Sequence, residues 1–219
     1  MLTLYGVYRS RATRNFWLLN ELGVAAEIRP VIQAYRLSDP LARDAPLNTL
    51  SPEFLAISAA GAIPVLRDGA LVLTESLAIN LYLARKFGGP LAPADEAENA
   101  LMTQWALYGA TAIETAALEI SYAYARGEVG TPQGDATLAA AESKLVRPMA
   151  ALETHLAAEP HMVGGRFTVA DINMAEIVRY AQPHAPLMAR APHVARWLSA
   201  CQARQSFRTM WAAREAEPI

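Results

Sequence analysis

The stretch from Gly61 to Ser76 constrains the fold more than any other part of the chain. Its sequence, GAIPVLRDGALVLTES, contains an apolar run entered at Pro64, an Asp-Gly pair, a second apolar run and the polar pair Glu75-Ser76. Proline is tolerated at the first position of a strand, and a proline in a tight turn is where a cis peptide bond occurs. Because Asp-Gly favours a hairpin turn, the stretch predicts a β-hairpin that begins beside a cis Pro64 and leads into a helix.

The two ends of this hairpin predict a binding site. With Pro64 cis, the backbone N–H and C=O of Ile63 would face outward and pair with an extended ligand, as an added strand does. The first turn of the helix offers N–H groups and a positive dipole end to a carboxylate, and Glu75 offers a partner to an ammonium group. An amide-bearing ligand with an α-amino-acid head fits this pattern. A plain hairpin, with Thr74 or Ser76 as a helix cap, explains the same residues and stays open.

Composition and charge exclude several classes of protein. The 219 residues are 53% hydrophobic and 18% charged, so the chain has enough apolar side chains to bury a core. The net charge of −2 excludes the basic surface that nucleic acid requires. No apolar run is long enough to cross a bilayer and the N-terminus lacks a signal-peptide pattern, so we expect a cytoplasmic protein with no membrane or nucleic-acid partner.

Metal and disulfide chemistry are not expected. Cys201 is the only cysteine, which excludes an internal disulfide and a cysteine-based zinc site. The four histidines, at positions 155, 161, 184 and 193, lack metal-ligand spacing, so we expect no metal.

The first third of the chain has the pattern of a small α/β domain. Apolar runs predict strands at Leu2–Tyr5 and Ala26–Ile32, and a helical stripe between them predicts a helix over Arg11–Leu22 that ends at a glycine. This order predicts a βαβ unit with parallel strands. With the hairpin and a helix over Glu75–Phe87, it gives the thioredoxin-like layout, here without a Cys-x-x-Cys motif. The long connection Gln33–Ser51 is typical of a functional or mobile loop.

The remaining two-thirds predict an all-helical domain. The breaker cluster GGPLAP places a linker over residues 88–94, between a thioredoxin-like domain at 1–87 and an all-α domain at 95–219. Two apolar stripes at helical spacing predict buried helix faces. They consist of Leu101, Trp105, Tyr108, Ala112 and Ala116, and of Leu138, Leu145, Met149, Leu152 and Leu156. Further on, Thr168 and Asp171 predict a capping box at the start of a helix.

Four stretches, spread over nearly the whole chain, carry a family resemblance through their order and spacing. They are SRATR with WLL and ELG between Ser10 and Gly23, GAIPVL from Gly61, ES with AI and YL from Glu75, and FTVAD from Phe167. In these residues the chain resembles the cytosolic glutathione S-transferase family, and within it the bacterial members of serine type.

The resemblance implies that the hairpin site binds glutathione as co-substrate. Ile63 beside a cis Pro64 would pair with the cysteinyl part of glutathione, and Glu75 and Ser76 would hold its γ-glutamyl head. Arg11 is a further candidate for contact with glutathione.

One departure from the family concerns the glycyl carboxylate of glutathione. Many members carry a lysine just before the Ile/Val-Pro pair, whereas this chain has Ala62. We expect Arg11, or Arg36 or Asn48 from the long loop, to take the place of that cation.

The resemblance also implies how the thiol is activated. Ser10, at the junction of the first strand and helix, matches the serine that stabilises the glutathione thiolate in serine-type classes. A free thiol has a pKa near ~8.5, so a hydroxyl donor and a helix N-terminus would help it to ionise at neutral pH. Tyr5 is the competing donor, since other classes use a tyrosine at the end of the first strand. In the alternative interpretations, Ser10 only caps the helix and Tyr5 only fills the core.

The electrophile is expected to bind between the two domains, where ligand sites often form. The candidate pocket residues are Tyr8, Trp105, Tyr108, Tyr122 and Tyr124. Packing within a helical core is the alternative role for each of these aromatic side chains.

The sequence thus predicts a glutathione transferase, in which the thiolate attacks a small hydrophobic electrophile; conjugation, peroxidase and dehalogenase chemistry all stay open. The family further implies a homodimer and a role in detoxification. The lack of a cysteine near position 10 argues against catalysis by thiol exchange. The alternative is a transferase-fold protein that binds ligands or scaffolds partners without catalysis, which Ala62 and the Gln33–Ser51 segment favour.

Overall fold

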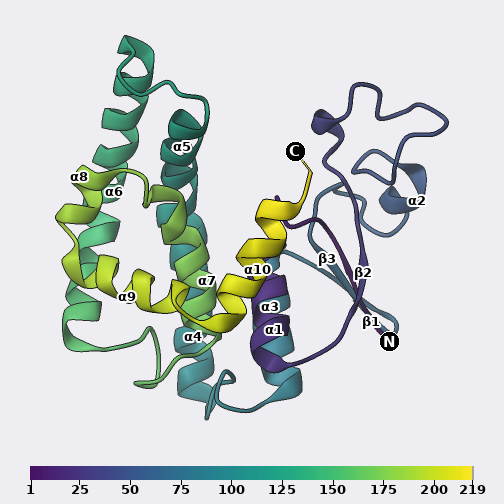
Figure 1. Cartoon of the computed structure of the whole chain (residues 1–219). Coiled ribbons are helices and arrows are strands. Elements are labelled where there is room, and N and C mark those ends of the chain that lie inside the picture. The colour runs from purple at the N-terminus through teal and green to yellow at the C-terminus, as the bar shows by residue number, and fades with distance from the viewer. Residues whose placement is uncertain (219) are drawn as a thin grey trace. The chain divides into compact units, whose positions relative to one another are not determined.

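The computed structural model describes residues 1–218, which form two compact units (Figure 1). Residues 1–87 and 205–218 make up the first unit, and Gly88–Arg204 make up the second. The chain leaves the first unit where the breaker cluster begins and returns to it at Gln205. The sequence assigned residues 205–218 to the helical domain, whereas their contacts group them with the first unit. The division into a glutathione-binding domain (1–87), a linker (88–94) and a substrate-binding domain (95–219) stays a prediction.

A mixed four-stranded sheet in the order β2-β1-β3-β4 forms the base of the first unit. Strand β1 (Leu2–Tyr5) is parallel to β2 (Glu27–Arg29) and antiparallel to β3 (Val65–Asp68), which forms a hairpin with β4 (Leu71–Thr74). This topology is the predicted thioredoxin-like layout. Strand β2 is shorter than the predicted Ala26–Ile32, because a proline with no N–H to donate follows it directly.

Helices α1 (Thr13–Leu22) and α3 (Ser76–Phe87) pack together and cover one face of this sheet (Figure 1). Gly23 ends α1 in the left-handed conformation with φ +63°, as predicted. The short helices η1 (Ala34–Arg36) and α2 (Pro52–Leu55) lie in the connection between β2 and β3.

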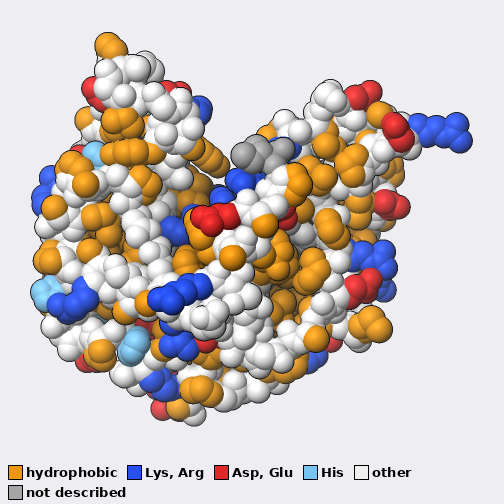
Figure 2. Space-filling view, viewed as in Figure 1, with side chains coloured by type: hydrophobic (Ala, Val, Ile, Leu, Met, Phe, Trp, Pro, Cys, Tyr) orange, Lys and Arg blue, Asp and Glu red, His pale blue; other side chains and the backbone are white. Residues whose placement is uncertain are grey.

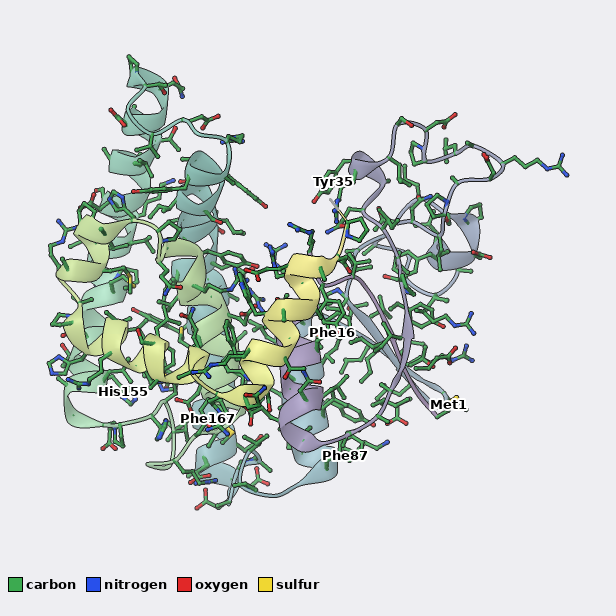
Figure 3. The ribbon with its side chains drawn as sticks, in the orientation of Figure 1. Met1, Phe16, Tyr35, Phe87, His155 and Phe167 are labelled. Atoms are coloured by element: carbon green, nitrogen blue, oxygen red, sulfur yellow. The ribbon has the colours of Figure 1, made fainter. Side chains whose placement is uncertain are left out.

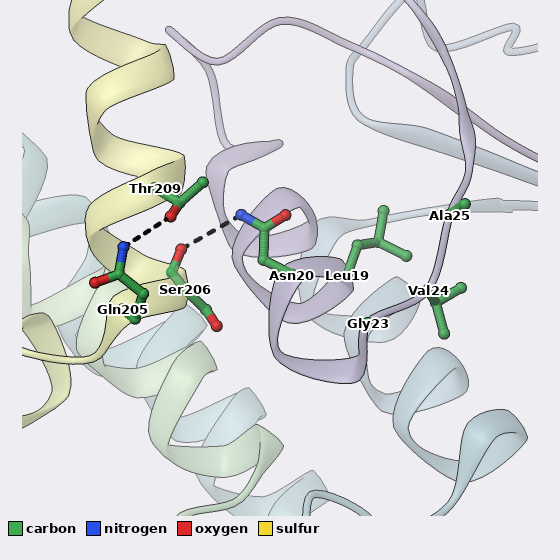
Figure 4. A pocket seen from close by; sticks show the side chains of 8 residues that line it. All are labelled: Leu19, Asn20, Gly23, Val24, Ala25, Gln205, Ser206 and Thr209. Atoms are coloured by element: carbon green, nitrogen blue, oxygen red, sulfur yellow. Dashed lines mark hydrogen bonds between the residues drawn. The ribbon is translucent and has the colours of Figure 1, made fainter.

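The last helix, α10 (Gln205–Ala216), packs on α1. The rings of Trp17 and Phe207 meet edge to face, with centroids 4.9 Å apart. Beside this contact, Asn20 Nδ2 donates a hydrogen bond to the C=O of Ser206 at 3.3 Å (Figure 4). These contacts make α10 a part of the first unit.

The second unit is helical. Its elements are α4 (Glu96–Tyr108), the π-helical turn η2 (Gly109–Ile113), α5 (Glu114–Ala125), α6 (Pro132–Ala158), α7 (Val169–Val178), η3 (Arg179–Ala181), α8 (Ala185–Ala189) and α9 (Pro192–Gln202). Every residue of α7 is buried, because α4, α5 and α9 all pack against it. A helix that is buried on all sides belongs at the centre of such a unit. The capping box of Thr168 and Asp171 that starts α7 is confirmed.

One of the two predicted apolar stripes is correct, and in the other only Ala116 is buried. All the predicted residues of the α6 stripe, from Leu138 to Leu156, are buried. In the α4 stripe, Leu101 is 44% exposed and Trp105 and Tyr108 are only half-buried. The buried positions lie one residue further along, at Met102, Ala106, Gly109 and Ile113. The cause is the close approach of α7: a Cβ atom on Gly109 would lie 2.6 Å from Ile177 Cδ1.

The surface carries charges of both signs. On the face drawn in Figure 2, basic side chains are scattered among acidic ones. Among the described residues, no helix combines the length and the hydrophobicity that a bilayer crossing needs.

Candidate functional site

The peptide bond between Ile63 and Pro64 is cis, as the sequence predicts. Pro64 is buried and leads directly into β3, whereas Ile63 is half-buried. Within the part of the chain that the structure describes, no backbone hydrogen bond joins the N–H or the C=O of Ile63. Both groups are therefore available to an extended ligand.

Helix α3 begins at Ser76, one residue later than predicted, because Glu75 has a φ of +67°. A left-handed conformation is costly for a residue with a side chain, and such residues concentrate at functional sites. The side chain of Glu75 is exposed, while Ser76 is 4% exposed. The chain thus presents one acidic side chain and one hydroxyl at the positive end of α3.

Ser76 belongs to a buried group of polar side chains that the sequence did not predict. Arg14 Nη1 donates to Ser76 Oγ at 2.9 Å. Asn15 Nδ2 donates to the C=O of Ser76 at 2.9 Å and to Asn80 Oδ1 at 2.7 Å. Asn80 Nδ2 donates to the C=O of Arg14 at 3.1 Å. We call these four residues the α1–α3 polar cluster; polar residues on otherwise apolar helix faces were its one signal in the sequence.

Ser10 is half-buried and lies in the turn that leads into α1. Its Oγ donates to the C=O of Val7 at 2.6 Å and accepts a bond from the N–H of Ala12 at 3.1 Å. The hydroxyl therefore stabilises the turn before α1. It is not the helix cap that the sequence offered as the alternative, because the cap position is Ala12. These two bonds use the proton and one of the two acceptor positions of Oγ. Rotation about the Cβ–Oγ bond can redirect the proton from Val7 to a ligand.

A carboxylate from the other end of the chain binds the loop before Ser10. Glu217 Oε1 accepts the N–H of Tyr8 at 2.8 Å, and Oε2 accepts the N–H of Arg9 at 2.6 Å. Arg9 Nε in turn donates to the C=O of Glu217 at 2.9 Å. Burial, and then the negative charge of Glu217, raise the pKa of Tyr8. The Tyr8 ring stacks on Phe16 of α1, which Figure 3 labels, at a centroid distance of 4.0 Å.

Tyr5 takes the core position that was the alternative to a catalytic role. Its side chain is 7% exposed and clusters with Val31, Phe54 and Val65. The rings of Tyr5 and Phe54 have centroids 6.3 Å apart.

The structure divides the aromatic candidates of the second unit among separate contacts. Trp105 and Tyr108 meet edge to face, with ring centroids 5.6 Å apart, and the centroid of the Trp105 ring lies 4.9 Å from that of His155. The hydroxyl of Tyr124 lies 3.2 Å from Nδ1 of His184. Tyr122, on the same helix, is 53% exposed.

One of the three residues expected to replace the missing cation at Ala62 has another role. Asn48 is fully buried, and its amide donates to the C=O groups of Pro40 and Pro46 and accepts from the N–H of Leu50. Asn48 therefore holds its own loop together and is removed from the candidates.

The two arginine candidates, Arg11 and Arg36, also belong to the first unit. Arg36 donates to the C=O of Pro218 at 3.1 Å, and Arg11 is exposed. Neither position is tied to Ala62 by a hydrogen bond that the structure defines.

One pocket of the first unit, with a volume of about 370 Å³, lies where α1 and α10 meet (Figure 4). The residues that line it are Leu19, Asn20, Gly23, Val24, Ala25, Gln205, Ser206 and Thr209. None of the predicted site residues is among them. In the described part of the chain, no group of three or more His, Cys, Asp or Glu side chains is arranged to hold a metal ion.

Comparison with known proteins gives matches over both units. The family model of the glutathione S-transferase N-terminal domain matches residues 4–91, and that of the C-terminal domain matches residues 135–200. Glutathione S-transferase 3 of Zea mays is 33% identical over 99% of this chain and 96% of that protein.

Solved structures agree with these matches. One match is the structure of glutathione S-transferase III in its apo form. The alignment covers 100% of this chain and 99% of that one, with 32% sequence identity and a TM-score of 0.78. A theta-class glutathione S-transferase of Xanthomonas axonopodis pv. citri, solved with glutathione bound, is 29% identical over 95% of each chain, with a TM-score of 0.76.

Proposed function

The chain belongs to the cytosolic glutathione S-transferase family, and from this premise we propose that it is a glutathione transferase that delivers the glutathione thiolate to a small hydrophobic electrophile. The observation that carries the proposal is the site on the first unit. It combines an unpaired Ile63 backbone beside cis Pro64 with the Ser76 hydroxyl at the start of α3.

Each part of glutathione has a counterpart in this site. The backbone of Ile63 pairs with the cysteinyl amide groups as a neighbouring strand would. The γ-glutamyl carboxylate accepts from Ser76 Oγ and the first N–H groups of α3, and the ammonium group pairs with Glu75. Arg11, which is exposed, and Arg36 are the remaining candidates for the glycyl carboxylate.

Ser10 is the proposed catalytic residue. Its hydroxyl turns from the C=O of Val7 to the sulfur of bound glutathione and stabilises the thiolate, so the thiol proton leaves to solvent at neutral pH. The sulfur then forms a C–S bond with the electrophile, and a leaving group departs with its bonding electrons. Tyr5 is the weaker candidate, because its ring lies in the core. The serine type of the enzyme is therefore part of the proposal.

The electrophile pocket is proposed from the aromatic candidates. Tyr8 is the strongest, since it lies two positions before Ser10 and its ring is half-buried. The candidates on the second unit are Trp105, Tyr108, Tyr122 and Tyr124. A homodimer, a cytoplasmic location and a role in detoxification are proposed from the family relationship alone.

Replacement of Ser10 tests the mechanism. We expect Ser10→Ala to bind glutathione in calorimetry, and the pKa of the bound thiol, measured by thiolate absorbance, to rise by about 1–2, the value of one hydrogen bond to a charged sulfur. Ser10→Thr, which keeps a hydroxyl, and Tyr5→Phe should leave the thiolate band near its wild-type position. An unchanged band in Ser10→Ala would assign thiolate stabilisation to another donor.

A second candidate function is binding without catalysis. The exposed Ala62 favours it, since the family's usual cation is missing there. Elongation factor 1-gamma 2 of Oryza sativa subsp. japonica is also 35% identical, over 58% of this chain and 30% of that protein. Absence of glutathione binding to the wild type at millimolar concentration would favour this second function over the enzyme.

A further inference from the structure

The guanidinium of Arg14 is 1% exposed and lies directly behind the glutathione-binding end of α3. Its Nη1 donates to the Oγ of Ser76, which is itself almost fully buried. A charged group is removed from water here at a considerable cost in solvation. The bond to Ser76 places this charge behind the residue proposed to bind a carboxylate.

This bond decides what the Ser76 hydroxyl can do. A hydroxyl has one proton and two acceptor positions, and Arg14 fills one of the acceptor positions. The proton must then point away from Arg14, and no acceptor among residues 1–218 takes it. Arg14 therefore keeps the hydroxyl as a donor for a group from outside the chain.

The charge of Arg14 acts in the same direction as this bond. The N-terminus of α3 carries a positive partial charge, and the cationic guanidinium of Arg14 lies against Ser76 at the same end of the helix. In a buried setting the attraction between charges is screened less than in water. An anion at Ser76 thus meets two sources of positive potential.

We propose that Arg14 is a positioning residue for the α-carboxylate of the γ-glutamyl group, acting through Ser76 Oγ; this inference rests on the proposed binding of glutathione. It assigns to Arg14 the selectivity for ligands whose head carries that carboxylate. A purely structural role would instead join α1 to α3, as Asn15 and Asn80 do within the same cluster.

The test compares glutathione with 4-aminobutanoyl-cysteinylglycine, the same tripeptide without the α-carboxylate. In Arg14→Gln, we expect glutathione affinity in calorimetry to fall about 10- to 100-fold, the range of a charge-assisted hydrogen bond, and affinity for the analogue to change less than about twofold. In turnover of 1-chloro-2,4-dinitrobenzene, the KM for glutathione should rise and kcat at saturating glutathione should stay nearly constant.

Two further variants separate positioning from structure. Asn80→Ala disturbs the cluster but not the bond to Ser76 Oγ, so it should weaken both ligands equally. In the double variant Arg14→Gln with Ser76→Ala, the loss should match that of Ser76→Ala alone, because Arg14 acts through that hydroxyl.

Equal weakening of both ligands by Arg14→Gln, or no change for either, would overturn the inference. If Arg14→Gln does not fold, Arg14→Lys takes its place, since it keeps the positive charge but not the planar guanidinium. The ratio of the affinity for glutathione to that for the analogue should then fall at least about threefold. Unchanged selectivity in Arg14→Lys would equally contradict the inference. Failure of the wild type to bind glutathione would instead remove the proposed function itself.

Discussion

Gly61, two residues before Ile63, has a φ of +58° and lies tight against the neighbouring loop. A Cβ atom at this position would lie 2.8 Å from the C=O oxygen of Thr49 and 3.2 Å from a methyl group of Leu55. We expect Gly61→Ala to destabilise the protein by about 2–4 kcal/mol, from the left-handed backbone and the displacement of Thr49 together. Urea unfolding at pH 7 measures the loss, and glutathione affinity should fall with it because the backbone of Ile63 moves.

Gly69 provides the matched control for this substitution. It has nearly the same φ, +61°, but a Cβ atom there would have no neighbour within 4 Å. Gly69→Ala should therefore cost only about 1–2 kcal/mol, the price of the backbone conformation. Equal losses in the two variants would show that the contact with Thr49 is unimportant.

Single residues were predictable where a local rule joins residue type to backbone. The cis bond at Pro64 and the capping box of Thr168 and Asp171 follow from such rules, and both are present. The bond between Arg14 and Ser76 joins residues 62 positions apart, and no local pattern indicates such a pair. The same holds for Glu217, which binds the N–H groups of Tyr8 and Arg9 from the opposite end of the chain.

Among the elements, α4 is joined to its surroundings by the ion pair of Glu98 and Arg166. Arg166 donates to both carboxylate oxygens of Glu98, at 2.8 and 2.7 Å, and to the C=O groups of Pro90 and Ala92. The Arg166 fork, followed by the N–H of Ala94, lowers the pKa of Glu98 to about 2. This arrangement holds the segment before α4 and the loop before α7 together.

The lowered pKa gives a signed pH dependence. Because the folded-state pKa lies below the ordinary value of 4.5, the stabilisation is complete above pH 4.5 and is lost as the pH falls towards about 2. We expect Glu98→Gln to lower the free energy of unfolding at pH 7 by about 1–2 kcal/mol, since the pair is partly exposed to solvent. Thermal melts of variant and wild type should converge as the pH falls from 4.5 to about 2.

Glu96, two positions earlier and exposed, provides the control for the loss of one charge near the start of α4. Glu96→Gln should change the stability by less than about 0.5 kcal/mol at any pH in this range. A difference between Glu98→Gln and wild type that persists unchanged at pH 2 would contradict the ionic origin of the effect.

Elements were predictable where their signals are local, and less so where another element shapes them. Helix α1 with its glycine stop, the hairpin of β3 and β4, and the buried face of α6 follow from sequence periodicity and turn residues. The π-helical turn at Gly109–Ile113 arises where α7 approaches α4 closely, and that approach also moves the buried face of α4 by one residue.

At the scale of the whole molecule, the first unit is built from both ends of the chain. The apolar side chains of α10 fit a helical partner in either unit, so periodicity alone could not assign the helix. Its partner is set by side-chain complementarity: Phe207 of α10 meets Trp17 of α1 edge to face, with ring centroids 4.9 Å apart. Sequence therefore predicted both fold classes but not the return of the chain to the first unit.

Two truncations distinguish the contributions of α10 and of Glu217. A chain that ends at Arg204 loses the buried Phe207 and Met210, and should lose about 5 kcal/mol or more of stability, with a red shift of Trp17 fluorescence. A chain that ends at Ala216 keeps these contacts and loses the carboxylate bonds to Tyr8 and Arg9, which should cost about 1–3 kcal/mol.

The chain that ends at Ala216, which lacks Glu217, should also show a changed ultraviolet titration of Tyr8. Because the charge of Glu217 contributes to the raised pKa of Tyr8, its removal should lower that pKa, while burial keeps it above the ordinary value of 10.0. Ultraviolet titration, with a Tyr8→Phe variant of each chain to isolate the signal, measures the change. Full-length Glu217→Gln, which keeps the tail but removes the charge, should shift the pKa in the same direction. An unchanged pKa in both would mean that the Glu217 carboxylate does not occupy this loop in solution.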